Sequence, residues 1–145
     1  MPTRETYTCH SAEDKATRMN NRPAIVQIDE HTSEDETTVT ISLSWHDEHF
    51  FGTANGSSDP SSRARLVGEA TLRAVEEVAD HRVSMQLEAV ATTELGETQI
   101  AMAQVLMDGV PVPLVGSALL EERDATAATV RAVLDAINRR LEQVL

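Results

Sequence analysis

The chain has 145 residues, with 24 acidic and 12 basic side chains and a formal net charge of −12 at pH 7. Because binding to phosphate backbones or anionic lipids needs clustered Lys and Arg, this balance argues against nucleic acid and membrane surfaces as partners. One cysteine permits no internal disulfide, and the sequence lacks both a bilayer-spanning apolar run and the apolar segment of a secretory signal, so we expect a cytoplasmic protein.

Residues 1–22 are polar and have no hydrophobic period, which predicts a flexible tail. The remaining residues, 23–145, are enough for one hydrophobic core, and we expect a single domain. Its first predicted element is a short apolar strand at Ala24–Ile28, followed by an exposed acidic loop over residues 29–36.

Strict alternation of apolar and polar residues over Thr38–Trp45 predicts a half-buried strand. The acidic pair Asp47-Glu48 suits a turn, after which the chain returns as the second strand of a hairpin. In that register Trp45 lies opposite Phe50, and His46 faces His49 across the turn.

A polar stretch with two glycines, GTANGSSDP (residues 52–60), leads into a helix. We interpret it as the corner between a strand and a helix, with the glycines supplying unusual backbone angles. Asp59 suits the N-cap and Pro60 the first helical position. Small apolar residues follow at helical spacing, namely Leu66, Val67, Ala70, Ala74 and Val78.

The second half of the chain repeats this order of elements. Residues 83–90 and the run TQIAMAQVLM (residues 98–107) predict two strands, the second apolar enough to be covered on both faces. Asp108-Gly109 predicts a hairpin turn, after which VPVPLVGSALL returns. Asp124 then caps a second helix, with an apolar stripe of Val130, Val133, Leu134, Ile137, Leu141 and Val144.

Two local likenesses indicate a duplication with a period near 60 residues. Residues 26–29 (VQID) align with residues 85–88 (MQLE), and Ala70-x-Leu72-x-Ala74 aligns with Ala132-x-Leu134-x-Ala136. We therefore predict an α/β fold of the α+β type, with two pseudo-symmetric βββα units and a mainly antiparallel sheet packed against two helices. The units are residues 23–80 and residues 81–145.

The returning segment of the second half contains Pro111 and Pro113. Two prolines at this spacing remove two amide donors from one side of a strand, so that side should be a sheet edge or a break in pairing. Because a blunted edge does not readily accept another strand, we expect any dimer to form elsewhere.

The sequence offers few candidates for catalysis or metal binding. His46 and His49 raise the alternative of a surface metal contact, but zinc needs three or four converging ligands; Cys9-His10 belongs to the tail. Ser117 lacks the G-x-S-x-G surroundings of a hydrolase nucleophile, and the glycine stretch matches neither a dinucleotide fingerprint nor a Walker sequence. We therefore predict no metal, no cofactor and no enzymatic activity.

Three segments, in this order, resemble the C-terminal regulatory domain of 2-isopropylmalate synthase, the leucine-feedback domain built from two βββα units. GTANGSSDP resembles the glycine-bearing turn into that family's first helix. HRVSMQLEAVATTELGETQIAMAQVLMDG (residues 81–109) resembles the start of its second unit, and ATVRAVLDAINRRL (residues 128–141) its closing helix. The likeness covers residues 24–145.

The resemblance implies a non-catalytic regulatory or dimerisation module that binds a small amino or keto acid near the two glycine-bearing segments, as a homodimer or with another protein. The free N–H groups of the first helix would hold the ligand's carboxylate. The implied ligand-binding residues are Gly52, Asn55, Gly56, Ser57, Ser58, Asp59, Gly116 and Ser117. The second segment departs from the family because Ser117 and Ala118, and no further glycine, follow Gly116. That departure favours the alternative of a structural adaptor that binds another protein and no small molecule.

Overall fold

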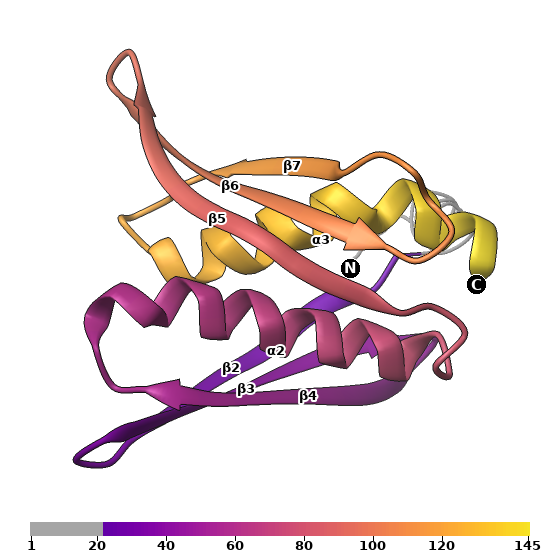
Figure 1. The fold of residues 1–145 in the computed structure, drawn as a ribbon, viewed down its shortest axis with the longest axis horizontal. Helices are drawn as coiled ribbons and strands as arrows, with labels where there is room; N and C mark the ends of the chain where they lie inside the picture. Colours follow the sequence, from indigo (N-terminus) through magenta and orange to yellow (C-terminus); the bar gives the residue numbers. More distant parts are fainter. Residues whose placement is uncertain (1–21) are drawn as a thin grey trace, which may run out of the picture.

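The computed structural model describes residues 22–145, which form two βββα units in succession (Figure 1). The first contains β2 (Ala24–Thr32), β3 (Glu36–Trp45), β4 (Glu48–Ser57), a 3-10 turn (Pro60–Ser62) and α2 (Arg63–Val78). The second contains β5 (Met85–Leu95), β6 (Thr98–Met107), β7 (Leu114–Leu119) and α3 (Ala125–Val144). The predicted α+β fold is confirmed. Of the predicted tail, residues 1–21 lie outside the described part of the chain.

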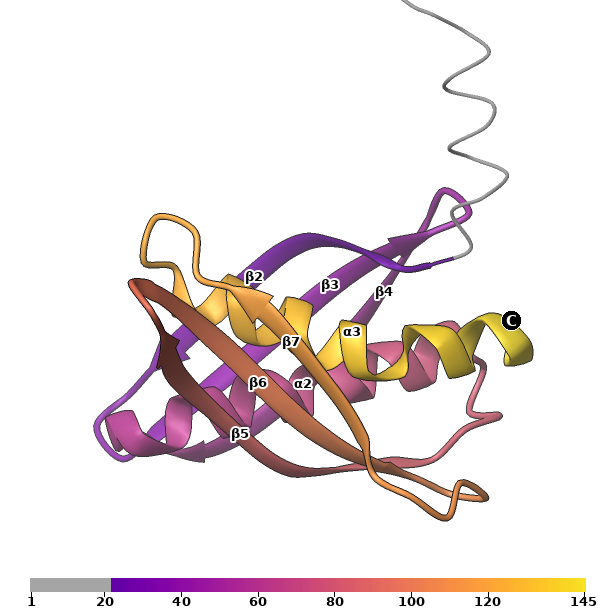
Figure 2. The same cartoon turned by 90° about the horizontal axis from the view of Figure 1, so that it is seen from above.

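The two helices form a central layer between two antiparallel sheets, β2-β3-β4 and β5-β6-β7 (Figures 1 and 2). They run in the same direction and begin at the same end of the molecule. α2 packs against β3 and β4 of its own unit and against β5 of the other, while α3 packs against β6, β7 and α2. The antiparallel pairing is thus divided between two sheets, with one core between them.

Coverage from two sides leaves α2 with only a narrow solvent-facing stripe. On α2 this stripe carries charged residues at a spacing of four, Arg65, Glu69, Arg73 and Glu77. The rest of the helix, from Leu66 to Val78, is almost entirely buried. A helix that is apolar over most of its circumference needs partners on several sides, and the two sheets and the neighbouring helix provide them.

Matching irregularities show that the two units share one plan. A β-bulge interrupts β2 between Ile25 and Gln27, and another interrupts β5 between Leu87 and Ala89, 62 residues later. The helices correspond at this same spacing, as predicted. The predicted strand alignment is three residues out, because Leu87 corresponds to Ile25 and not to Ile28. Short apolar runs do not fix a register by themselves; the bulges and the pairing partners do.

The first hairpin turns one residue earlier than predicted. His46 and Asp47, with φ angles of 51° and 64°, form a two-residue turn that pairs Trp45 with Glu48. Phe50 therefore lies opposite Leu43, and His49 opposite Ser44. The predicted pairs Trp45–Phe50 and His46–His49 are therefore wrong. The turn forms at His46-Asp47 because positive φ at both positions gives a backbone twist that matches the twist of the flanking strands.

Two further predictions about the strands are corrected. The acidic loop predicted over residues 29–36 is shorter, since β2 continues to Thr32 and β3 begins at Glu36. Pro111 and Pro113 lie in the loop before β7, so they remove no donor from that strand, and its edge is not blunted by them. The second strand of this unit, β6, is covered on one face only: Ala101, Ala103 and Val105 are buried, whereas Met102 is 40% exposed.

Candidate functional site

The glycines of the two predicted segments lie in strands, and the corner before the first helix is formed by Ser58 and Asp59. β4 continues through Gly52, Asn55, Gly56 and Ser57, and β7 contains Gly116 and Ser117. Neither Gly52 nor Gly56 is among the glycines with positive φ. The prediction that they supply unusual backbone angles is therefore wrong.

Gly52 and Gly116 instead allow a strand to touch a helix backbone. A Cβ on Gly52 would lie 2.1 Å from the amide nitrogen of Ala74 and 2.2 Å from the carbonyl oxygen of Ala70. A Cβ on Gly116 would meet the matching atoms of Ala136 and Ala132 at 2.2 and 2.3 Å. Both glycines serve the packing of the central layer and lie beneath the surface.

The polar residues that end the first segment are bonded within the protein. Asp59 accepts a hydrogen bond from the Ser61 amide at 3.1 Å, and the Ser57 hydroxyl accepts one from the Asp59 amide at 3.1 Å. Ser58 donates from its hydroxyl to the carbonyl of Glu34 at 3.2 Å. The Asp59 carboxylate thus binds the Ser61 amide, which is one of the helix-start N–H groups that the resemblance offered to the carboxylate of a ligand. Asp124 caps α3 in the same way, accepting from the Ala127 amide at 3.0 Å.

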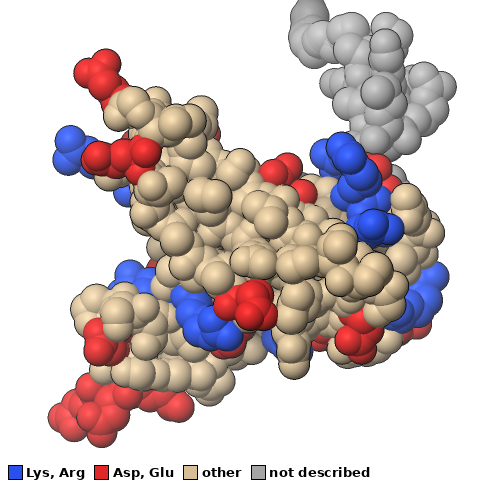
Figure 3. All heavy atoms as spheres, turned by 45° about the horizontal axis from the view of Figure 1, so that its top comes forward, with Lys and Arg blue, Asp and Glu red and all other residues tan. Residues whose placement is uncertain are grey.

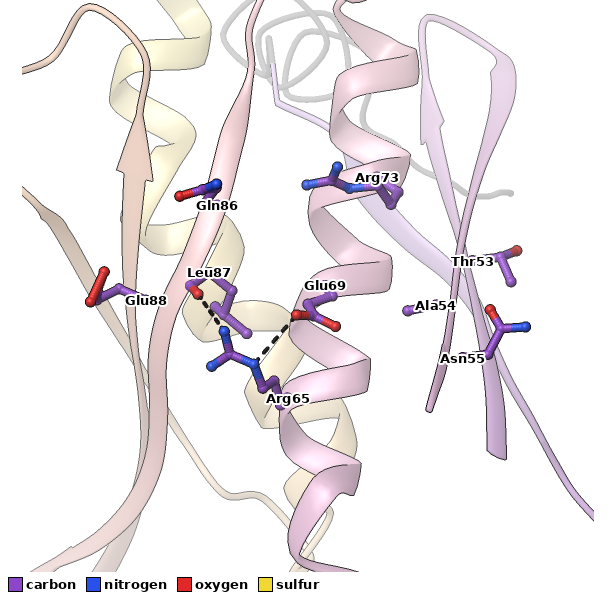
Figure 4. A pocket seen from close by; sticks show the side chains of 9 residues that line it. All are labelled: Thr53, Ala54, Asn55, Arg65, Glu69, Arg73, Gln86, Leu87 and Glu88. Carbon is purple, nitrogen blue, oxygen red and sulfur yellow. Dashed lines mark hydrogen bonds and ion pairs between the residues drawn. The ribbon is translucent and has the colours of Figure 1, made fainter. Parts of the chain in front are cut away.

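A groove of about 550 Å³, the α2 groove, runs beside α2 between the edge strands β4 and β5 (Figure 4). Figure 4 shows that Thr53 and Asn55 point away from α2, whereas Ala54 between them points toward it. Of the eight predicted residues, Asn55 is the one that lines this groove. The full lining is Thr53, Ala54, Asn55, Arg65, Glu69, Arg73, Gln86, Leu87 and Glu88.

The arginines of the α2 groove hold β5 against α2. Arg65 donates to the carbonyl of Leu87 at 3.0 Å and lies 3.4 Å from the Glu69 carboxylate. Arg73 donates to the carbonyl of Met85 at 2.8 Å and lies 3.3 Å from the Glu76 carboxylate. With Glu69 and Glu88 also in the lining, the formal charges of the groove cancel. This arrangement suits a structural seam better than an anion site.

A second groove, of about 390 Å³, lies beside α3 and β7, and we call it the α3 groove. Its lining consists of Arg22, Pro113, Leu114, Val115, Asp135, Ala136, Asn138, Arg139 and Arg140. Among these described residues Asp135 is the only acid, and its carboxylate accepts the Ser117 amide at 3.0 Å. The α3 groove therefore adjoins the second predicted segment through the backbone of Ser117.

The α3 groove has an excess of cationic donors in a strongly acidic chain. Arg22 forms an ion pair with Glu142. Within the described part of the chain, Arg139 and Arg140 have no ion-pair partner, and both are exposed. Guanidinium groups with unused N–H donors are suited to bidentate binding of a carboxylate.

One residue that lines the α3 groove, Asn138, has a buried side-chain acceptor without a donor. Asn138 Oδ1 is buried and has no hydrogen-bond partner among the described residues. The matching position in α2 is Glu76, whose carboxylate accepts the amide of Met85 at 2.9 Å. The residue that corresponds to Met85 is Pro23, which has no N–H to donate. The second unit thus has an acceptor, Asn138 Oδ1, at the position of Glu76, but the first unit has no N–H at the position of Met85 to donate to it.

Comparison with protein-family models and with curated protein sequences finds no match for this chain. Among residues 22–145, no group of three or more His, Cys, Asp or Glu side chains is placed to hold a metal ion. Cys9 and His10 lie outside the described residues. No helix in the described part of the chain has the length and apolar character needed to cross a membrane.

Sequence reasoning did not single out Asn138, Arg139 or Arg140 as binding residues. Arginines near the C-terminal end of a helix are common without any binding role, because the helix dipole favours cations there. Asn138 could have been identified from its correspondence to Glu76. That comparison needs the alignment of the two helices, which pairs Asn138 with Glu76, and also the alignment of the two first strands, which pairs Pro23 with Met85. The incorrect strand alignment hid the replacement of Met85 by Pro23 in the first unit.

Proposed function

We propose that this chain is a non-catalytic regulatory or dimerisation module, similar to the feedback domain of 2-isopropylmalate synthase, that binds a small carboxylate in the α3 groove. The observation that carries the proposal is the set of unpaired cationic donors, Arg139 and Arg140, beside the buried and unpartnered Asn138 Oδ1. The paired βββα units support it, because the resemblance implies this architecture.

The donor set favours one kind of carboxylate over another. An arginine would bind the carboxylate of the ligand through two parallel hydrogen bonds. Asn138 Oδ1 would accept a hydrogen bond from a neighbouring ammonium or hydroxyl group, since a buried acceptor without a partner costs about 1–3 kcal/mol. A keto acid has no donor at that position, so we expect amino or hydroxy acids to bind more tightly than keto acids.

A thermal-shift panel of amino, hydroxy and keto acids tests the proposal. A ligand at a hundred times its Kd stabilises the folded state by about 2.7 kcal/mol, which raises the Tm of a domain of this size by roughly 10 °C. We expect Arg139→Gln and Asn138→Leu to reduce that shift strongly. No shift with any compound in the panel would refute the ligand.

A matched variant controls for the loss of one positive charge. Arg123 is exposed in the loop before α3 and does not line the α3 groove. Arg123→Gln changes the net charge by the same amount as Arg139→Gln, and we expect it to keep the full ligand-induced shift. If both variants lose the shift equally, the ligand responds to net charge and not to the groove.

The alternative function, an adaptor that binds another protein, is favoured by a different observation. The outer face of the β5-β6-β7 sheet exposes Met102, Val115 and Leu119 to solvent. Exposed apolar side chains grouped on one face commonly mark a protein-binding surface. An adaptor would use this face and would show no Tm shift with the acid panel.

A further inference from the structure

The outer face of the β5-β6-β7 sheet carries no charged side chain at its centre, although a quarter of the chain's residues are charged. The strand register places three rows of three residues on this face. Met102 and Ile100 occupy the middle strand, Val115 and Leu119 the β7 edge, and Ala89 and Ala91 the β5 side. Thr93, Gln104 and Ser117 fill the remaining positions, so all nine are uncharged. Figure 3 shows the surface of this sheet as largely tan, with charged groups at its margins.

The first unit provides an internal comparison for this face. Thr40 corresponds to Met102, and its hydroxyl lies 3.2 Å from that of Thr53 in a cross-strand hydrogen bond. Asp29 and His31 stand where the second unit has Ala91 and Thr93. Solvated antiparallel sheets usually show such polar outer residues. Because both sheets cover the same helical layer, the fold itself does not require the outer face of the second sheet to be apolar.

We propose that this face is the self-association surface of the protein and that it packs against the same face of a second copy. The inference specifies the dimerisation part of the proposed function and does not depend on a ligand. The apolar sequence of β6 predicts a strand that is covered on both faces. In a single copy the outer face is uncovered, since Met102 is 40% exposed, and a second copy would cover it.

The shape of the face suits a partner of identical shape. A shallow apolar hollow of about 280 Å³ lies over Ala89, Ala91 and Met102. On the β7 side, Val115 and Leu119 are 61% and 56% exposed; Val115 also lines the hollow, and we call this exposed pair the ridge. A twofold axis in the interface and parallel to β6 would place β7 of one copy over β5 of the other. The ridge of each copy would then enter the hollow of its partner, as an isologous interface requires.

Charge and area favour a second copy that binds reversibly. Each copy has a net charge of −12, so contact through an uncharged face avoids bringing acidic groups together. Three strands about 4.8 Å apart, over the six residues of β7 at about 3.4 Å each, cover roughly 300 Å² in plan. With side-chain relief, two such faces bury on the order of 1,000 Å² in total, near the lower limit for a specific interface. We expect a dissociation constant in the micromolar range.

Sedimentation velocity over a concentration series across the micromolar range tests the inference on the full chain. We expect a reversible monomer–dimer equilibrium, and we expect Met102→Asp to raise the dimer Kd by about 100-fold or more because it buries an unpaired charge. Thr40→Asp is the matched control: it adds the same charge at the corresponding position of the other sheet and should leave the Kd unchanged.

Leu119→Lys separates apolar contact from net charge. It lowers the net negative charge, so simple repulsion predicts a tighter dimer, whereas loss of the ridge predicts a weaker one. Circular dichroism confirms that each variant is folded, which is expected since all three sites face solvent. A chain that stays monomeric at every concentration, or a dimer that tolerates both Met102→Asp and Leu119→Lys, overturns the inference. The thermal-shift panel tests ligand binding in the α3 groove, whereas sedimentation velocity tests self-association. Either proposal can therefore be refuted without the other.

Discussion

At Gly52 and Gly116 the absence of a methyl group decides how closely a strand can approach a helix. The nearest atoms to an added Cβ at either position belong to the helix backbone, at 2.1–2.3 Å. Backbone atoms inside a packed helix cannot move aside as a flexible side chain can. The two positions therefore set the spacing between each helix and the third strand of its unit.

We predict that Gly52→Ala and Gly116→Ala each destabilise the protein by about 3 kcal/mol or more through overpacking. The control is Gly56→Ala in the same strand, where the added Cβ would meet Leu66 Cδ2 at 2.9 Å. That methyl group is the end of a flexible side chain, so we expect a loss of about 1 kcal/mol or less. Urea unfolding monitored by circular dichroism measures all three. Equal losses at Gly56 and Gly52 would contradict the close-contact explanation.

At the scale of the elements, an aspartate caps α3 and another caps the 3-10 turn before α2, whereas the N-cap of α2 itself is Ser62 and not the predicted Asp59. Asp124 accepts from the Ala127 amide at the start of α3, and Asp59 accepts from Ser61 in the 3-10 turn before α2. A helix start has backbone N–H groups without intrahelical partners, so each cap has a local energetic effect. At the start of the first helix, the Asp59 cap takes up one of the N–H groups that the resemblance offered to a ligand.

We predict that Asp124→Ala lowers the free energy of unfolding by about 1 kcal/mol, because it leaves the Ala127 amide without its acceptor. Asp124→Asn keeps an acceptor oxygen, so it should retain most of the stability. Thermal and urea unfolding of the three proteins provide the measurement. An asparagine variant as unstable as the alanine variant would show that the charge of Asp124, and not its hydrogen bond, stabilises the helix.

At the scale of the whole molecule, neither unit encloses a core by itself. α2 packs against β5 and α3 of the second unit as well as against its own sheet. Glu76 accepts the amide of Met85, and Arg73 donates to the carbonyl of the same residue, so polar contacts also join the units. Separation would expose apolar side chains on most sides of α2, including Val67 and Val75, which are fully buried.

We predict that residues 22–82 expressed alone show no cooperative unfolding transition as a monomer, since the apolar burial that stabilises α2 comes from both units. Circular dichroism during a urea titration, with the full chain as reference, tests this. A monomeric fragment that unfolds cooperatively would contradict a core shared between the units.

The sequence alone determined the βββα duplication, the Asp124 cap of α3 and the correspondence of the two helices, because these depend on local periodicity and on residues close together in the chain. It could not determine that Gly52 and Gly116 lie in strands, since their role depends on a helix backbone about 20 residues away. Nor could it show that Pro23 deprives Asn138 of a donor, or that the outer face of β6 is uncovered. Tertiary structure decided these points, because strand register and the division into two sheets depend on pairing between distant segments.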